Sequence, residues 1–302
     1  MRASLRRIWL TALSEWRDAI RSRRALVLLV LYLATSVMCM YGTISALGRM
    51  EKELVTILGL PADGPEGVVT ESLWKSKPFR RMVRSAVGNS LVFEDLLARH
   101  PVELLYAWFA FLFAPMLVTL VSGGRVADER RTGSVRYMLM RVTRFEWSVG
   151  KYAGQAMLIA CALAISALGT WAVVWWRLPT GSALRLFAPL IGWSAKTWVY
   201  SLSWLGLALG LSHLTRSSGK TVALGLLAVA ILSVAPTMLE FFVAHHGWPQ
   251  ALLHLEALTP ADAKGSLWRS SPTALAAASF HLATLGLAYL TAGAAVFARR
   301  DA

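Results

Sequence analysis

The sequence predicts an all-helical (all-α) integral membrane protein, and three observations support this fold class. Of the 302 residues, 56% are hydrophobic and only 16% are charged, whereas soluble domains carry about 25% charged residues. The mean hydropathy is +0.52. Apolar runs long enough to cross the roughly 30 Å hydrocarbon core of a bilayer recur along the chain. Backbone polar groups must be satisfied inside lipid, so we expect these runs to be helices.

Residues 1–24 are predicted to form an amphipathic helix that lies at the cytoplasmic surface of the membrane. Apolar residues recur there at spacings of three and four, and Trp9 and Trp16 are suited to the headgroup region. A solvated basic tail is the alternative, which these tryptophans disfavour. The apolar stripe consists of Leu5, Ile8, Trp9, Ala12, Leu13, Trp16 and Ile20.

Residues 25–302 are interpreted as one transmembrane domain with six spans. Residues 47–103 form an insert on the outer side, where we expect two or three short helices. Residues 123–151 form the longest cytoplasmic loop. The six predicted spans are residues 25–46, 104–122, 152–176, 187–211, 221–243 and 274–297.

The distribution of Lys and Arg predicts the orientation of these spans. The segments at one side, 1–24, 123–151, 212–220 and 298–302, contain 18 basic and 6 acidic residues, whereas the other side contains 12 and 10. The more basic side is expected to face the cytoplasm, so both termini are cytoplasmic. The net charge of +14 is therefore a topology signal, and nucleic acid is not an expected partner.

No pattern for catalysis or metal binding stands out. The Gly-Lys-Thr sequence at 219–221 matches only the end of a phosphate-binding loop, because Leu214 occupies the position of the first glycine. His245 and His246 have no carboxylate or cysteine at a metal-ligand spacing. We therefore expect no catalytic residue, no metal and no cofactor in this chain.

Three ionisable residues, Lys196, Glu240 and His281, lie inside predicted spans. Ionisable groups in membrane spans are functional candidates by default, so these residues are candidates for the lining of a translocation path. An equally weighted alternative is that the Lys196 side chain snorkels outward and His281 caps a carbonyl.

The cytoplasmic loop carries the most specific pattern in the chain. Gly133 is expected to end one short helix, and the Ser134 hydroxyl to cap the next. Arg136 and Arg144 are expected to stay in water. A short, capped, amphipathic helix is typical of a docking element. Its apolar face would consist of Val135, Met138, Leu139 and Val142.

This loop resembles the one between the second and third spans of ABC transporter permeases, the membrane subunits of the type-2, exporter-like class. The polar stretch 212–218 and the ending around Phe297 also resemble that family. The chain departs from the family pattern at 141–143, where apolar and proline residues are usual. Eight loop positions match in order and spacing: Glu129, Gly133, Ser134, Leu139, Arg144, Glu146, Gly150 and Lys151.

The resemblance implies a permease of the bacterial cytoplasmic (inner) membrane that exports an amphipathic, lipidic or drug-like substrate. It implies a dimer of permease chains, identical or different, with separate cytoplasmic ABC ATPase subunits that hold the ATP and Mg²⁺. Glu129 and Arg136 are expected to make polar contacts with the ATPase, and Met138 and Leu139 to form its apolar seat. The ATPase-coupling residues would be Glu129, Gly133, Ser134, Arg136, Met138, Leu139, Arg144 and Glu146.

Three other functions were weighed against this one. A force-transmitting subunit that acts on a partner at the outer (periplasmic) side is favoured slightly by the long insert at 47–103. An integral membrane enzyme is disfavoured, because carboxylates and histidines do not converge at one membrane face. A purely structural anchor would not need a capped loop helix.

Overall fold

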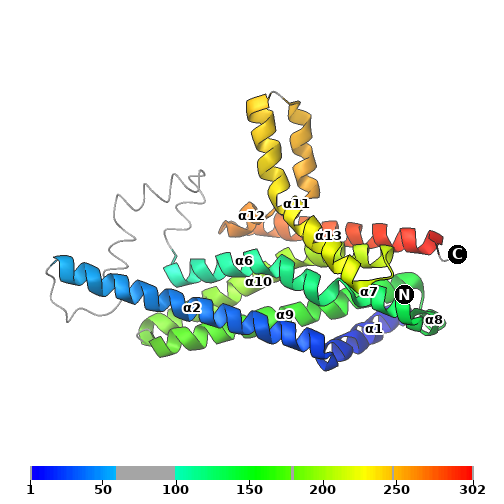
Figure 1. Cartoon of the computed structure of the whole chain (residues 1–302), viewed down its shortest axis with the longest axis horizontal. Coiled ribbons are helices and arrows are strands. Elements are labelled where there is room, and N and C mark those ends of the chain that lie inside the picture. Colours follow the sequence, from blue (N-terminus) through cyan, green and yellow to red (C-terminus); the bar gives the residue numbers. More distant parts are fainter. Residues whose placement is uncertain (1, 59–98, 178–179, 247, 301–302) are drawn as a thin grey trace.

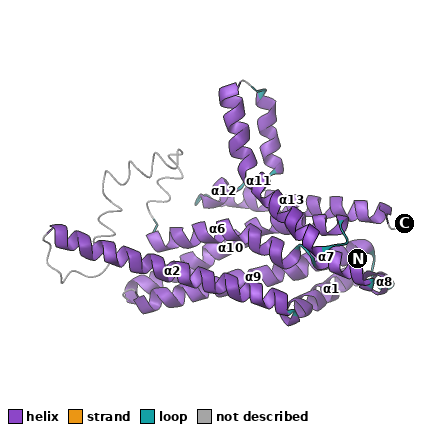
Figure 2. Ribbon diagram, in the orientation of Figure 1, coloured by secondary structure: helices purple, strands orange, loops and turns teal. Residues whose placement is uncertain are grey.

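The computed structural model describes residues 2–58, 99–177, 180–246 and 248–300, and these residues form helices without any strand (Figures 1 and 2). The outer insert was predicted at residues 47–103. Of these, 47–58 and 99–103 are described, and the short helices expected at 59–98 lie outside the described residues. The helices are α1 (Arg2–Arg21), α2 (Arg23–Leu58), α6 (Pro101–Ser122), α7 (Arg125–Thr132), α8 (Ser134–Leu139), α9 (Arg144–Arg177), α10 (Thr180–Leu214), α11 (Ser218–His246), η1 (Gln250–Leu258), α12 (Lys264–Trp268) and α13 (Pro272–Arg300).

Each predicted span lies within one of the long helices, and five helical segments are apolar and long enough to cross a membrane. The helix that contains the predicted span 187–211, α10, is not among them. Six spans therefore remain a prediction with respect to α10. The five qualifying segments are Ala25–Ala46, Pro101–Thr132, Arg144–Arg177, Ser218–His246 and Pro272–Arg299.

Helix α10 lies at the centre of the bundle. It packs against α6, α9 and α13, which surround it along the long axis of the molecule (Figure 1). A central helix can carry polar side chains that lipid would penalise, provided that they find partners inside the protein. The buried serine and threonine residues of α10 are Ser194, Thr197, Ser201, Ser203 and Ser212.

Glycines allow α10 and α13 to approach each other closely. A Cβ added at Gly206 would lie 1.9 Å from the carbonyl oxygen of Gly286, and one added at Gly210 would lie 2.5 Å from the carbonyl oxygen of Tyr289. Small residues at such crossings bring two backbones into contact, which is how membrane helices associate without a hydrophobic driving force. The core of the bundle is therefore fixed by glycine positions as well as by apolar side chains.

Helix α11 leaves the bundle partway along its length and forms a projecting arm with η1 (Figure 1). Pro236 lies inside α11. Proline removes one backbone hydrogen bond and crowds the preceding turn, which explains a bend in the helix. The arm presents exposed apolar side chains, among them Met238, Phe241 and Leu258.

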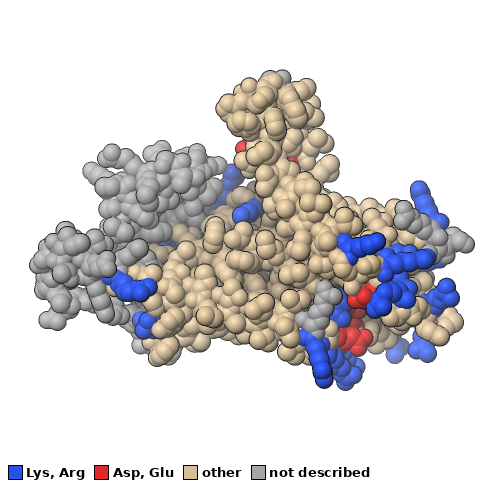
Figure 3. Space-filling model, in the orientation of Figure 1, with Lys and Arg blue, Asp and Glu red and all other residues tan. Residues whose placement is uncertain are grey.

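Basic side chains gather at the end of the bundle formed by α1, α7 and α8 (Figure 3). Most of the surface between this end and the opposite one carries no charged side chain in this view (Figure 3). The described residues therefore have a charged end and an apolar middle, as a membrane-spanning bundle requires.

The N-terminal helix has a different division of faces from the predicted stripe. Thr11, Ala12, Glu15 and Ala19 are buried against the bundle and Trp16 packs against its core, whereas four other large apolar residues are exposed. The structure thus gives α1 a narrow face of small and polar residues for the protein and a broad apolar face outside it. The exposed apolar residues of α1 are Leu5, Trp9, Leu10 and Ile20.

Candidate functional site

The loop between α6 and α9 folds into two short helices, α7 and α8, that meet at Gly133. The backbone of Gly133 has a φ of 76°, a left-handed conformation that glycine adopts without a steric penalty. The N–H of Gly133 donates to the carbonyl of Arg130 over 3.4 Å. The helix break therefore lies where the sequence predicts it.

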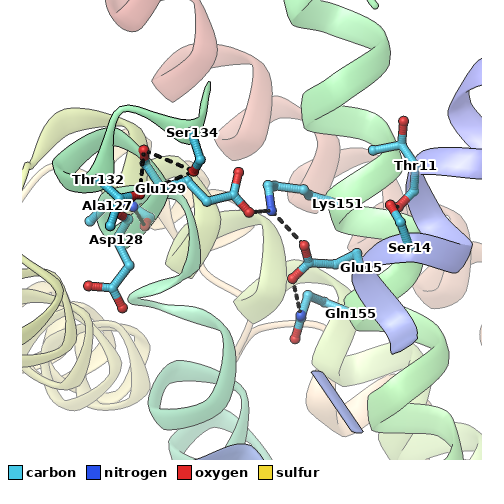
Figure 4. Close-up of polar contacts among 11 residues, drawn as sticks. Thr11, Ser14, Glu15, Ala127, Asp128, Glu129, Thr132, Ser134, Lys151 and Gln155 are labelled. Atoms are coloured by element: carbon cyan, nitrogen blue, oxygen red, sulfur yellow. Dashed lines mark hydrogen bonds and ion pairs between the residues drawn. The ribbon is translucent and has the colours of Figure 1, made fainter. Parts of the chain in front are cut away.

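The cap expected from the Ser134 hydroxyl is wrong. Gly133 occupies the N-cap position of α8, and no side chain there bonds the first amides. The Ser134 hydroxyl instead donates back to the carbonyl of Glu129 over 3.3 Å and lies 3.1 Å from the Thr132 hydroxyl (Figure 4). The Ser134 hydroxyl thus connects the start of α8 to α7 by hydrogen bonds.

Helix α9 begins with a reciprocal cap between Thr143 and Glu146. The Thr143 N–H donates to the Glu146 carboxylate over 3.0 Å, and the Glu146 N–H donates to the Thr143 hydroxyl over 3.2 Å. Arg7 of α1 lies 3.7 Å from the same carboxylate. Glu146 is buried, so it serves this cap and does not face outward. Thr143, one of the residues that depart from the family pattern, supplies the other half.

A buried ion-pair network connects α7, α9 and α1 (Figure 4). The Lys151 ammonium lies 2.5 Å from the carboxylate of Glu15 and also bonds the carboxylate of Glu129. Gln155, one turn further along α9, donates to the other oxygen of Glu15 over 2.6 Å and accepts from the Ser122 hydroxyl over 2.9 Å. The side chains of Lys151 and Glu15 are only 3% and 6% exposed. Charges buried to this extent are tolerated only when they are paired.

Both carboxylates of this network are held inside the protein by Lys151. Glu129, expected to contact the ATPase, points into the protein toward Lys151 (Figure 4). Burial by itself raises the pKa of Glu15, but the positive charge of Lys151 and the hydrogen bonds from Lys151 and Gln155 outweigh it, so the pKa is lowered. Glu15 therefore stays ionised inside the contact between α1 and α9.

Two glycines of α9 let α1 come close enough for this network to form. A Cβ at Gly150 would lie 2.6 Å from the Thr11 side chain, and a Cβ at Gly154 would lie 2.6 Å from the carbonyl oxygen of Ala12. The two glycines are four residues apart and so lie on one face of the helix. The Gly-Lys pair at 150–151 therefore combines a close contact with a buried charge.

A second set of contacts fastens the loop to the ends of α10 and α13. The guanidinium of Arg130 donates to the carbonyl of His213 and lies 4.7 Å from the centre of the Phe297 ring. Arg144 lies 5.5 Å from the same ring and donates to the carbonyl of Ala298 over 2.8 Å. The Ser212 hydroxyl accepts from the N–H of Ala127 over 3.0 Å. The stretch 212–218 and the ending at Phe297, which the sequence links only by resemblance, thus contact the loop.

The outward surface of α8 differs from the predicted one. Val135 is buried, and Met138, Leu139 and Val142 pack against the protein's own core. The exposed apolar side chains are instead Tyr137 (72% exposed), Met140 (75% exposed) and, at the start of α9, Phe145. Among the predicted coupling residues, Arg136 is exposed as expected. The outward surface of the loop is Arg136, Tyr137, Met140, Arg141 and Phe145.

The three candidates for a translocation path occupy separate surroundings. The Lys196 ammonium lies 4.5 Å from the centre of the Trp193 ring and donates to the carbonyl of Arg269 over 3.4 Å. Glu240 is exposed on the arm of α11. The Nε2 atom of His281 is buried without a hydrogen-bond partner among the described residues.

Sequence reasoning missed a charged cluster at the end of the bundle opposite the termini. Glu103 of α6 is buried, and its carboxylate accepts from the indole N–H of Trp193 over 2.7 Å and from Arg99 over 2.6 Å. Arg99 also lies 5.1 Å from the Trp193 ring and donates to Ser270 over 3.0 Å. The four-residue spacing of Arg99 and Glu103 could have revealed their ion pair, but nothing local indicated Trp193.

Comparison with known proteins agrees with this arrangement. The family model described as ABC-2 family transporter protein matches residues 9–302, which include all the helices of the described structure apart from the first residues of α1. A search of curated proteins found no match. The chain therefore belongs to the ABC-2 family of transporter proteins, the multi-pass membrane permeases of ABC transporters, which imply an ATPase partner.

Proposed function

We propose that this chain receives the motion of a separate ATPase subunit through α8 and transmits it to the spans. The observation that carries the proposal is the contrast between the two sides of the loop. Its outward surface exposes Tyr137 and Met140. On its inner side, Arg130 contacts α10 and α13, and Glu129 bonds Lys151 of α9, which also pairs with α1. A movement applied to the outward surface is therefore passed to four helices at once.

The proposed seat for the ATPase is an apolar centre with a basic border. Tyr137, Met140 and Phe145 supply the apolar contacts, and Arg136 and Arg141 flank them. Aromatic residues, Met and Arg are the residue types that protein interfaces favour. The complementary ATPase groove would be apolar and bordered by acidic side chains. This seat replaces Met138 and Leu139, which pack on the protein's own core.

We further propose that the basic end faces the cytoplasm of a bacterium, with both termini there and α10 as the sixth span. The concentration of Lys and Arg at this end supports the orientation (Figure 3). ATP and Mg²⁺ belong to the ATPase subunit in this proposal. Because a ligand shifts a conformation only through its different affinities for two states, the ATPase must contact α8 differently before and after ATP binding.

A second permease chain, identical or different, is proposed to cover part of α11. This helix is the least buried of the five apolar segments, and its exposed residues include Leu224, Leu227 and Ile231. A path for an amphipathic, lipidic or drug-like substrate would then lie between the two chains. Export, the direction typical of the resemblance, completes the proposal.

Force transmission to an outer partner is a second candidate function, favoured by the length of α2. The helix continues to Leu58, about 12 residues and roughly 18 Å beyond the predicted end of its span at residue 46. A rigid helix of this length reaches well past the bilayer surface. An outer-side protein that copurifies with the chain, together with ATPase activity independent of substrate, would support this function over transport.

The test is to purify the tagged full-length chain from its native membrane in mild detergent and identify what accompanies it. We expect a stoichiometric ATPase with the wild type and with the conservative pair Tyr137→Phe/Met140→Leu. The pair Tyr137→Asp/Met140→Asp should lose it, because it places charges in the apolar seat. If the Asp pair keeps the ATPase, the seat is wrong; if the wild type carries none, the coupling proposal itself fails.

A further inference from the structure

An open apolar groove runs along the outside of the bundle between α2 and α9. Its volume is about 540 Å³, which is within the usual range of ligand sites. Helix α2 supplies Leu33 and Val37, and α9 supplies Leu168, Ala172 and Trp176. Both helices are apolar enough to cross a membrane over this stretch, so the groove opens toward hydrocarbon and would hold an apolar chain.

Gly169 lines the groove and lets α9 lie close to α2 there. A Cβ there would lie 3.0 Å from Val37 and 3.2 Å from Leu33. The buried hydroxyls of Ser36 and Ser166 lie 2.8 Å apart and join the same two helices. A buried polar contact therefore holds α2 and α9 together, while the groove between them stays open.

A cation is fixed at the end of this groove. The guanidinium of Arg177 lies 4.8 Å from the centre of the Tyr41 ring and 5.8 Å from that of Trp176. It also donates to the Ser45 hydroxyl over 2.8 Å. Trp176 lines the groove and contacts Arg177 as well, so the apolar groove and the cation form one continuous surface.

We propose that this surface binds an anionic phospholipid of the surrounding bilayer, with an acyl chain in the groove and the phosphate on Arg177. A guanidinium has five N–H donors in a planar fork that matches phosphate oxygens, and Ser45 takes one of them. Aromatic contacts with Tyr41 and Trp176 hold the side chain in place. Tryptophan at this position is also typical of the headgroup level of a membrane.

The charge requirement is tested on the full-length chain, stripped of lipid in detergent and titrated with phosphatidylglycerol while bound lipid is counted by native mass spectrometry. We expect Arg177→Gln to weaken the tightest binding at least fivefold. Arg185→Gln, which removes the same charge from an exposed residue of α10, should leave it unchanged. Equal losses in both variants would indicate general charge attraction and overturn the proposal, as would equally tight binding of phosphatidylcholine.

The groove itself is tested with Ala172→Phe, which fills it without changing charge. The matched control is Ala277→Phe, on an exposed position of α13. We expect Ala172→Phe to weaken phosphatidylglycerol binding by a factor similar to that of Arg177→Gln, and Ala277→Phe to bind as the wild type does. Unchanged binding in Ala172→Phe, with an unaltered thermal unfolding temperature, would show that no acyl chain occupies the groove and overturn the proposal. None of these outcomes depends on an ATPase partner.

Discussion

Lys151 of α9 and Glu15 of α1 form a buried ion pair, with 2.5 Å between Nζ and Oε2, although 136 residues separate them in the chain. The same ammonium bonds Glu129 of α7. One side chain thus joins the N-terminal helix to the loop that we propose as the ATPase seat.

Replacing Lys151 by Met should destabilise the protein strongly. The substitution leaves the carboxylates of Glu15 and Glu129 without their cation, and breaking a buried pair from one side costs about 3–5 kcal/mol. The measurement is the thermal unfolding temperature of the purified chain, with exposed Arg141→Met as the control for charge. Adding Glu15→Gln to Lys151→Met should recover part of the loss; a double variant less stable than Lys151→Met would contradict the pairing.

Alanine should have opposite effects at two glycines. At Gly154 the new Cβ would meet the backbone oxygen of Ala12 at 2.6 Å, and overpacking of this kind costs about 1–3 kcal/mol. At Gly42, where nothing lies within 4 Å, alanine should stabilise α2 by about 0.5–1 kcal/mol through helix propensity. Limited proteolysis at the arginines of α1 measures its release. Equal cleavage of the Gly154→Ala and Gly42→Ala chains would show that Gly154 does not seat α1.

The contribution of Glu15 should disappear in acid. Its pKa is lowered in the folded protein from an ordinary value of 4.5, so the folded state binds this proton less tightly than the unfolded state does. The stabilisation is fully present above 4.5 and is lost as the pH falls through the folded pKa. Unfolding temperatures measured from about pH 6 to pH 3 should fall more steeply in the wild type than in Glu15→Gln. Parallel curves would rule out this linkage.

The cluster around Glu103 should respond differently to two substitutions. Glu103→Gln keeps an oxygen to accept from the Trp193 indole and loses only the charge opposite Arg99. Glu103→Leu removes both and leaves a buried N–H without an acceptor, which costs about 1–3 kcal/mol. Unfolding temperature should therefore rank the wild type first, Gln second and Leu last. The exposed Glu240→Gln is the control, and a Leu variant as stable as this control would refute the role of Glu103.

The sequence was sufficient for five of the six predicted spans and for the break in the loop, because both depend on local patterns. Runs of apolar residues predicted six spans, five of which lie in helices long and apolar enough to cross a membrane, and Gly133 predicted the end of α7. The reciprocal cap of Thr143 and Glu146 is also local, and its Thr-x-x-Glu spacing was readable.

Contacts between segments far apart in the chain could not be predicted from a single sequence. The apolar face of α8 was correctly recognised, but the sequence does not say whether such a face covers the protein's own core or a partner. Met138 and Leu139 cover the core, so Tyr137 and Met140 are left outside. Likewise a single sequence does not show that Glu129 of α7 forms an ion pair with Lys151 of α9.

The separation of Glu15 and Lys151 has a consequence for biosynthesis. At roughly 5–20 residues per second, Lys151 is synthesised about 7–27 s after Glu15. During that interval the Glu15 carboxylate lacks the buried ammonium of Lys151. The apolar side of α1, with Leu5 and Trp9 exposed even in the finished structure, can hold the nascent chain against the lipid headgroups until its partner arrives.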